Sequence, residues 1–584
     1  MARKKQPKKS TMPGWDSSVA PGGMANDHAG ISPFDDHGDD YDPDADSDFP
    51  SPDQSHGPQP KSKSSAVPVS TVLDTLAVYG DFFCVGEKAY WQRHASEVSY
   101  DHPGQVPSPD TWEAPIPVSG PAFKREVMQH FDRITPKSAK MKDVVAAAED
   151  TAYRASHIPS AAFTHYVAET PESPAAFLFA VAPAVLVKIT SSNIVAVRNG
   201  PDAGVLISLP PDFTPISWET LGKHYSPDVL HTPALHTAVL DDLPPPIATD
   251  GVHHNENRAL LLAFWFGLFF TAATQGRPVM GIFGAYQSGK TVTARAMGKL
   301  FYGREFDVSG GVGGGRAVKD LVAEMSATPF AVRDDMNRQP ESIVDTICQF
   351  ATGAKVALST FHETLAFESH RVTSNLVLTA HTPSWALRAD LLSRMIPVRL
   401  SRPDPQEFHL TEADRYARVE HYRAAAFAQT FAVIHKAMQT QGRWVCRTRF
   451  EDWETWVRRC ADVGGWHMLL ESAFHRLPMQ RVKLACDTDP WVAALYRVAC
   501  EIQARREHEG DLWYTAADLY DYVTQRLGGS AVDPVDKPSA SIIKSQHGLS
   551  SWLSRVNEQG GSVVEVMRGP LVGGSVTWSL VPRG

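Results

Sequence analysis

The middle of the chain alternates between short apolar runs and longer segments in which apolar residues recur at helical spacing. Four of the runs have the length and flanking residues of buried strands: 279–283, 329–333, 375–379 and 396–400. Between them, segments 290–301 and 342–350 have helical periodicity. Strands that alternate with helices are typical of a parallel sheet with helices on both faces. We therefore predict an α/β fold with such a core over residues 278–404.

The region before this core predicts a mixed α/β domain over residues 71–206. Its patterns predict strands at 76–79 and 82–85, helices at 124–134 and 144–155, and a hairpin of 184–189 with 193–198. Residues 207–277 then form a predicted connecting segment, proline-rich over 210–246, followed by a helix at 255–273. The apolar run from Ala259 to Ala273 is shorter than the roughly 20 residues of a membrane-spanning helix, which favours a buried core helix.

After the core, residues 405–510 predict a helical domain and residues 511–584 a winged-helix domain. In the latter, two helices precede two strands around a glycine-rich turn: 516–527, 548–558, 563–567, 575–580 and 568–574. A DNA-reading role would use side chains of the second helix and the wing, namely Gln546, Ser550, Ser551, Ser554, Arg555 and Arg568. Basic residues are sparse here, so a protein-interaction role stays open.

The amino-acid composition predicts a tail at the start of the chain and limits the partners that the protein could bind. Residues 1–70 are rich in Pro, Ser, Gly and Asp and poor in apolar residues, which predicts a disordered tail. The net charge of −10 excludes a basic surface over the whole chain, so nucleic acid would need a local patch or an inner pore. The six cysteines lack the spacing of a zinc or redox pair, which favours reduced thiols in a cytoplasmic protein without a membrane segment.

The strongest chemical signal is the segment GAYQSGKT, which satisfies the P-loop pattern G-x-x-x-x-G-K-[ST] between a predicted strand and a predicted helix. Its members are Gly284, Ala285, Tyr286, Gln287, Ser288, Gly289, Lys290 and Thr291. The glycines bring backbone N–H groups close to phosphate oxygens, and the following helix adds its dipole. Lys290 would contact the β- and γ-phosphates, and Thr291 would hold Mg²⁺. ATP and Mg²⁺ are therefore the expected ligands.

A hydrolase also needs acids at the end of a neighbouring strand, and Asp334 and Asp335 follow the run 329–333. Asp334 would hold Mg²⁺ through water, and Asp335 would orient or deprotonate the attacking water. The alternative is that the two aspartates cap the next helix. Arg333 stands where an apolar residue is usual at the end of such a strand.

Two further positions are candidates for contacts with the γ-phosphate. Thr379 and His381 both stand at the end of the third strand, and the sequence does not separate them, although a plain strand end is the alternative. Arg394 is the candidate for an arginine finger that reaches a neighbouring subunit's nucleotide, and Arg388 is second. Either arginine could instead form a structural ion pair with Asp390.

With these elements in order, residues 278–403 resemble the ATPase core of the superfamily 3-like, AAA+-related helicases of phages, plasmids and mobile elements. The resemblance rests on GAYQSGKT, on FAVRDD, and on the segment that runs from Thr352 to Leu400, and it covers about a quarter of the chain. One departure is the Thr379-Ala380-His381 sequence, where that family commonly has Asn.

The resemblance implies a ring, expected to be a hexamer, with a β-hairpin in its central pore that grips single-stranded DNA. Lys355, His362 and Arg371 would be the pore residues. The function predicted on this basis is an ATP-dependent DNA helicase or replication-initiator ATPase that acts on single-stranded or forked DNA, with a separate primase or polymerase as a further partner. The alternative is a non-unwinding ATPase switch of the defence or partition type, in which ATP binding gates assembly.

Overall fold

In the computed structural model, residues 67–584 form one compact unit. The residues that the structure describes are 67–94, 108–131, 139–170, 174–210, 212–225, 254–310, 317–359, 367–371, 374–381, 383–402, 411–528, 543, 545–559 and 563–583. Most of the tail predicted at 1–70 lies outside these residues, and helix α1 begins within the predicted range, at Val69.

A four-stranded parallel sheet organises the middle of the chain, as the alternation of strands and helices predicted. Its strands are β11 (Val279–Gly284), β12 (Phe330–Arg333), β15 (Asn375–Ala380) and β16 (Met395–Leu400). Their spatial order is β12-β15-β11-β16, and every neighbouring pair is parallel. All carboxyl ends therefore lie at one edge of the sheet, and all amino ends at the opposite edge.

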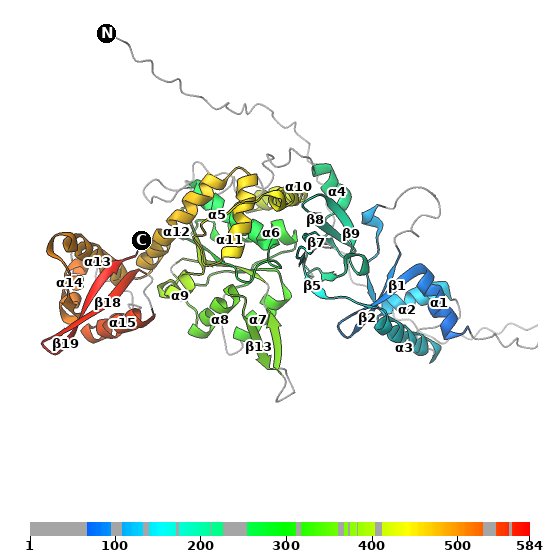
Figure 1. Ribbon diagram of the computed structural model, residues 1–584, viewed down its shortest axis with the longest axis horizontal. Helices are drawn as coiled ribbons and strands as arrows, with labels where there is room; N and C mark the ends of the chain where they lie inside the picture. The colour runs from blue at the N-terminus through cyan, green and yellow to red at the C-terminus, as the bar shows by residue number, and fades with distance from the viewer. Residues whose placement is uncertain are drawn as a thin grey trace, which may run out of the picture. The chain divides into compact units, whose positions relative to one another are not determined.

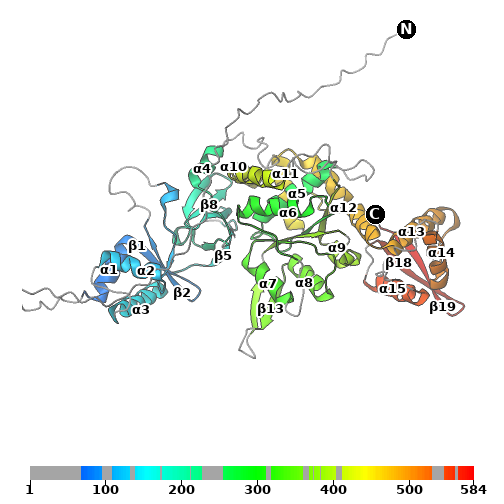
Figure 2. The same ribbon diagram turned by 180° about the vertical axis from the view of Figure 1, so that it is seen from behind.

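Helices cover both faces of this sheet (Figures 1 and 2). They are α5 (His254–Phe269), α6 (Lys290–Tyr302), α7 (Ala317–Ala327), α8 (Glu341–Ala351) and α9 (Ala389–Leu392). Both views place α5 and α6 on one side and α8 and α9 on the other. The ring of Phe330 contacts Phe264 of α5 and Phe301 of α6, so aromatic packing attaches both helices to β12.

Helix α5 contains most of the apolar run that the sequence assigned to a buried helix, and that prediction is confirmed. Its side chains from Ala259 to Phe266 are nearly all inaccessible to solvent, and Trp265 donates a hydrogen bond to Thr430 Oγ1 at 2.8 Å. Among the described residues, no helix combines the length and apolar character needed to cross a membrane.

The amino-terminal α/β region contains two separate four-stranded sheets. The first has the order β3-β2-β1-β4 and packs against α1 to α3; its elements are α1 (Val69–Tyr79), β1 (Gly80–Val85), β2 (Lys88–Arg93), β3 (Ile116–Pro117), α2 (Pro121–His130), α3 (Ala139–Arg154) and β4 (Ser156–His157). The second has the order β6-β7-β8-β9; this part of the chain comprises β5 (Ser160–Ala162), β6 (Thr164–Val167), β7 (Ala176–Ala182), β8 (Val185–Thr190), β9 (Ile194–Arg198), β10 (Leu206–Ser208) and α4 (Trp218–His224).

One predicted strand in this region is wrong, and one predicted hairpin is confirmed. Residues 76–79 end helix α1, because Val72 and Leu76 lie one helical turn apart and are both fully buried. The hairpin of 184–189 with 193–198 is present as β8 and β9, which pair antiparallel from Val185 with Arg198 to Ile189 with Ile194.

Helix α10 (Glu412–Gln439) connects the helix that follows the glycine-rich loop to the second amino-terminal sheet. The buried guanidinium of Arg423 donates to the carbonyl oxygens of the last three residues of α6, at 3.1, 3.0 and 3.2 Å. At the far end of α10, the His435 Nδ1 atom lies 2.8 Å from the carbonyl oxygen of Thr190, and Gln439 donates to Ser191 O at 2.6 Å. The Arg423 contacts satisfy carbonyl groups that a helix end leaves without partners.

The remainder of the chain is helical and ends in a small three-stranded sheet of order β17-β19-β18. Its elements are α11 (Glu451–Val463), α12 (His467–Thr488), α13 (Pro490–Glu509), β17 (Tyr514–Thr515), α14 (Ala516–Gly528), α15 (Gln546–Gln559), β18 (Val564–Val572) and β19 (Ser575–Pro582). The predicted turn at 568–574 is too long: only Gly573 and Gly574, with φ of +59° and +81°, separate β18 from β19. Two consecutive residues with positive φ suit a tight hairpin turn.

Two expectations from the sequence concern the hairpin and the cysteines. Strands β13 (Lys355–Ser359) and β14 (Phe367–Arg371) form an antiparallel pair, in which Lys355 is opposite Arg371. The third predicted pore residue, His362, lies outside the described residues. All six cysteines are free thiols, as their spacing predicted.

Candidate functional site

The glycine-rich loop (residues 284–291) connects the carboxyl end of β11 to the first turn of α6. A Cβ atom on Gly284 would lie 2.2 Å from the Leu400 carbonyl oxygen, so only glycine fits beside β16. Gly289 has a φ of +80° and is the residue that precedes α6. Gln287 also has a positive φ, +64°, and its Oε1 accepts a hydrogen bond from Arg402 at 2.7 Å. The loop therefore turns sharply and places the amino terminus of α6 at the edge of the sheet.

Lys290 is folded back over the loop that precedes it. Its ammonium group donates to the carbonyl oxygens of Gly284 at 3.0 Å and Ala285 at 2.9 Å. Burial lowers the pKa of Lys290 below its ordinary value, whereas the nearby charges of Asp334 and Asp335 raise it. The ammonium group thus lies among the loop carbonyls and close to both carboxylates.

Asp334 joins the loop to two other elements of the core. Its Oδ1 atom accepts a hydrogen bond from Thr291 Oγ1 at 2.8 Å and another from Thr379 Oγ1. Thr291 is in the first turn of α6, and Thr379 is on β15. The residues predicted to bind Mg²⁺, Thr291 and Asp334, are therefore in direct contact.

Asp335 is held in an unusual backbone conformation beside Asp334. Its φ is +54°, and its backbone N–H donates to Thr379 Oγ1 at 3.2 Å. The side-chain amide of Asn337 donates to Asp335 Oδ1, while Asn337 Oδ1 accepts from the His381 backbone N–H at 2.7 Å. A positive φ at a non-glycine residue is uncommon and is frequent at functional sites. The Asp335 side chain is exposed.

The sheet corrects the expectation that the acids follow a strand adjacent to that of the loop. Strand β15 lies between β11 and β12, so Asp334 is one strand further from the loop than predicted. The hydroxyl of Thr379 bridges this extra strand, because it contacts both Asp334 and the Asp335 backbone. The two candidates on β15 are also distinguished: Thr379 is buried within the cluster, whereas the His381 side chain is exposed.

Arg333, the unusual residue at the end of β12, pairs with Glu324 of α7 and donates to the Gly310 carbonyl oxygen at 3.3 Å. Its charge is therefore compensated within the core, and the strand keeps its three buried apolar residues.

Replacement of Thr379 by valine is expected to lower the rate of nucleotide hydrolysis at least about tenfold with little change in nucleotide affinity, because it removes one hydrogen bond to each aspartate. Thr379→Ser keeps the hydroxyl and should restore most of the activity. Steady-state kinetics and fluorescent-nucleotide binding on the two variants check this. Equal activity of Thr379→Val and wild type would show that the hydroxyl does not position the acids.

The donor set around Asp334 fits a magnesium ion. Mg²⁺ prefers hard oxygen ligands, usually one or two carboxylates or hydroxyls together with phosphate oxygens and water. The Thr291 hydroxyl and the Asp334 carboxylate supply such oxygens at one point, and the Ser288 hydroxyl lies fully buried in the loop without a partner among the described residues.

One of the two candidate arginines lies at the opposite edge of the sheet. Arg394 immediately precedes β16, and its carbonyl oxygen accepts from the Val279 backbone N–H at 2.9 Å where β11 begins. Arg388 instead pairs with Asp390 at 2.6 Å and Asp345 at 2.7 Å, so the structural ion pair left open for it is present. The Nη1 group of Arg394 donates to the backbone carbonyl of Asp390.

No family model matches this chain, and no curated protein matches it. Several solved structures are similar to it at low sequence identity. The apo A form of the NrS-1 C-terminal region has 11% identity and a TM-score of 0.33, over 88% of this chain and 99% of that chain. SCCmec type IV Cch, described as an active helicase, has 9% identity and a TM-score of 0.39, over 85% and 90% of the two chains. JCV helicase has 14% identity and a TM-score of 0.20, over 44% and 74%. These similarities are weak, so the site itself carries the functional argument.

Three residues of the site were not found from the sequence. Asn337 bridges Asp335 and the end of β15, Arg402 contacts Gln287, and an NH1 atom of Arg415 lies 4.0 Å from the position a Cβ on Gly289 would take. The positions of Arg402 and Arg415 follow from the return of the chain beside the loop after β16. No local motif signals such a return. For Asn337, its place two residues after Asp335 was the available signal.

Proposed function

We propose that this protein is a P-loop ATPase that uses ATP hydrolysis to move along single-stranded DNA, as a helicase or replication initiator acting in a ring. The observation that carries the proposal is the meeting of Lys290, Thr291, Asp334 and Asp335 at the carboxyl edge of one parallel sheet. A P-loop lysine, a hydroxyl and two acids are the parts that ATP hydrolysis requires.

In the proposed ATPase, each residue has a defined task. The loop N–H groups and the amino terminus of α6 bind the phosphates, and Lys290 leaves the Gly284 and Ala285 carbonyls to contact the β- and γ-phosphates. Thr291 and Asp334 hold Mg²⁺, which when bound neutralises the charge that develops on the phosphate oxygens. Asp335 accepts the proton of the attacking water, and Thr379 keeps both acids in place.

The ring is proposed because Arg394, at the opposite edge of the sheet, is placed to complete the site of a neighbouring copy rather than the site of its own chain. Arg394 cannot reach the loop of its own sheet, since a six-residue strand such as β11 spans about 20 Å. A neighbouring copy would bring its Arg394 to the nucleotide. In the same arrangement, the β13–β14 hairpin with Lys355 and Arg371 at its base would provide the DNA-binding element of the pore, and the terminal unit of α14, α15, β18 and β19 would act as a winged helix.

A forked-duplex unwinding assay tests the proposal. With ATP and Mg²⁺, wild type is expected to separate the strands, and single-stranded DNA should stimulate its ATPase activity. Lys290→Ala should do neither, whereas Lys223→Ala, which removes an exposed lysine paired with Glu219, should behave as wild type. Hydrolysis with ATP-dependent assembly but no strand separation would favour the non-unwinding switch. Absence of hydrolysis in wild type would contradict the proposal.

A further inference from the structure

A second arginine lies beside Arg394 at the amino edge of the central sheet. Arg449 precedes α11, far from Arg394 in sequence, and its NH1 group donates to Ser393 Oγ at 3.3 Å. Burial and, next, the charge of Arg394 lower the pKa of the Arg449 guanidinium below its ordinary value. An arginine stays protonated at neutral pH even so, and the edge therefore carries two adjacent positive charges.

Neither charge is paired with a carboxylate among the described residues. In the part of the chain that the structure describes, no ion pair involves Arg394 or Arg449, and the buried Arg394 Nε atom has no hydrogen-bond partner. Arg388, by contrast, forms ion pairs with Asp390 at 2.6 Å and with Asp345 at 2.7 Å. Two like charges held together without an ion pair to a carboxylate favour a bound anion.

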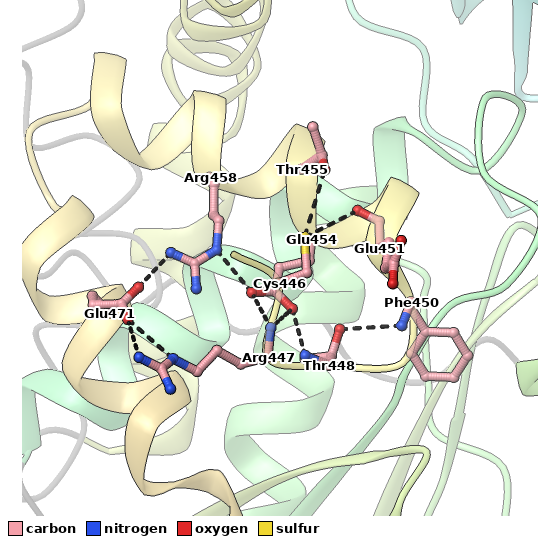
Figure 3. Close-up of polar contacts among 9 residues, drawn as sticks. All are labelled: Cys446, Arg447, Thr448, Phe450, Glu451, Glu454, Thr455, Arg458 and Glu471. Atoms are coloured by element: carbon pink, nitrogen blue, oxygen red, sulfur yellow. Dashed lines mark hydrogen bonds and ion pairs between the residues drawn. The ribbon is translucent and has the colours of Figure 1, made fainter. Parts of the chain in front are cut away.

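The segment that carries Arg449 is fixed by a buried carboxylate (Figure 3). Glu454, which is fully buried, accepts hydrogen bonds from the backbone N–H of Arg447 at 2.9 Å and of Thr448 at 2.6 Å. The Phe450 N–H donates to Thr448 Oγ1 at 3.3 Å. The backbone is therefore held on both sides of Arg449, while its own side chain is exposed.

The same network holds Glu454 itself. Arg458 donates to Glu454 at 2.8 Å and to Glu471 at 2.5 Å, and Arg447 donates to Glu471 at 3.1 Å (Figure 3). Breaking a buried pair of this kind leaves an uncompensated charge in the interior, so the network resists local opening. The conformational entropy lost by fixing the backbone around Arg449 is therefore lost when the protein folds, and not when a ligand binds.

A hollow of about 310 Å³ lies in front of this segment, between residues 275–276, Thr352 and residues 449–452. Arg449 lines it on one side, and Glu451 and Asp452 line it as well. A continuous phosphate backbone passing through the hollow would meet these two carboxylates. A compact anion that ends at the arginines would avoid them. The lining is therefore unfavourable for a continuous strand of DNA.

We infer that Arg449 acts together with Arg394 as a pair of cations that contacts the triphosphate held by the glycine-rich loop of an adjacent copy of this chain. The inference rests on the proposed function and adds a residue from outside the core sheet to the site. The loop of the adjacent copy presents Tyr286 with 80% of its surface exposed, as expected of a loop that faces another subunit. Each complete site then needs two copies, one for the lysine and acids and one for the arginine pair.

A mixing experiment tests this arrangement. Arg449→Ala is expected to lower the ATPase rate of the assembled protein at least about tenfold while its nucleotide affinity changes little. Lys290→Ala is inactive by itself. An equal mixture of the two should recover about a quarter of the wild-type rate, because one interface in four pairs an intact loop with an intact Arg449. If Arg449 acted within its own chain, neither partner would have a working site, and mixing would restore nothing.

Controls separate the contact from structural effects. Arg443→Ala removes an exposed arginine of the same segment and should leave activity unchanged. Arg449→Lys keeps the charge and should retain more activity than Arg449→Ala; both should unfold at the wild-type temperature. Loss of DNA binding with normal DNA-independent hydrolysis in Arg449→Ala would assign the arginine to DNA. An active wild type whose mixture is not restored, or whose Arg449→Ala variant is fully active, overturns the inference alone. A wild type without ATPase activity overturns the proposed function itself.

Discussion

Lys290→Ala is expected to reduce ATP hydrolysis at least about 100-fold, the size of effect that follows when one charge that stabilises the transition state is removed. In the structure, the Lys290 ammonium group is placed by the Gly284 and Ala285 carbonyls and lies near both Asp334 and Asp335. Alanine leaves these carbonyls without that donor and the phosphates without their point charge. Phosphate release by wild type and variant, measured at saturating ATP, checks the prediction.

The fold should survive this change, because Lys290 is half-buried and its aliphatic stem contributes little to the core. Thermal unfolding of Lys290→Ala should therefore match that of wild type within a few degrees. Lys223→Ala serves as the matched control for the loss of one positive charge. Hydrolysis by Lys290→Ala within a few fold of wild type would exclude the glycine-rich loop as the hydrolytic site.

The second large effect is expected from Asp335→Asn, which should bind ATP normally but hydrolyse it at least about 100-fold more slowly. Asparagine has the shape of aspartate and tolerates the positive φ of this position, so the change removes the charge without backbone strain. Asp334→Asn should behave differently: because Asp334 accepts from Thr291, its loss should weaken Mg²⁺-dependent nucleotide binding as well.

Binding of a fluorescent ATP analogue at several Mg²⁺ concentrations, together with single-turnover hydrolysis, distinguishes the two variants. The expected pattern is tight binding with blocked hydrolysis for Asp335→Asn, and an increased Mg²⁺ requirement for Asp334→Asn. Identical behaviour of the two variants, with hydrolysis close to that of wild type, would favour the alternative in which both aspartates only cap the next helix.

The strands and helices of the core could be predicted from the sequence because each is short, apolar and bounded by a turn residue. The order of the strands could not, since nothing local in 375–380 shows that β15 lies between β11 and β12. The strand predicted at 76–79 is wrong for a similar reason, because these residues end the helix Val69–Tyr79. A four-residue apolar run such as 76–79 fits either period, and only the burial of Val72 together with Leu76 selects the helix.

The candidate site, like the fold, could be predicted only in part from the sequence. The glycine-rich loop and the two aspartates were predictable because each motif is contiguous and its chemistry follows from its residue types. Asn337, Arg402 and Arg449 were not predicted, because each reaches its partner through the tertiary fold; Arg402, for example, meets Gln287 across more than 100 positions of sequence. The sequence also could not separate Thr379 from His381, since alternation along a strand does not say which hydroxyl or ring meets the acids.

Helix α10 has a mechanical consequence for the amino-terminal strands. With 28 residues it is about 42 Å long, and it runs without interruption. Near its start, Glu412 binds Arg295 of α6 at 2.6 Å, and Arg423 holds the last carbonyls of α6, so the two helices must tilt as one piece. Its last turn is bonded to Thr190 and Ser191. In the proposed ATPase, a small rotation of α6 on nucleotide binding would therefore be transmitted along α10 to the end of β8.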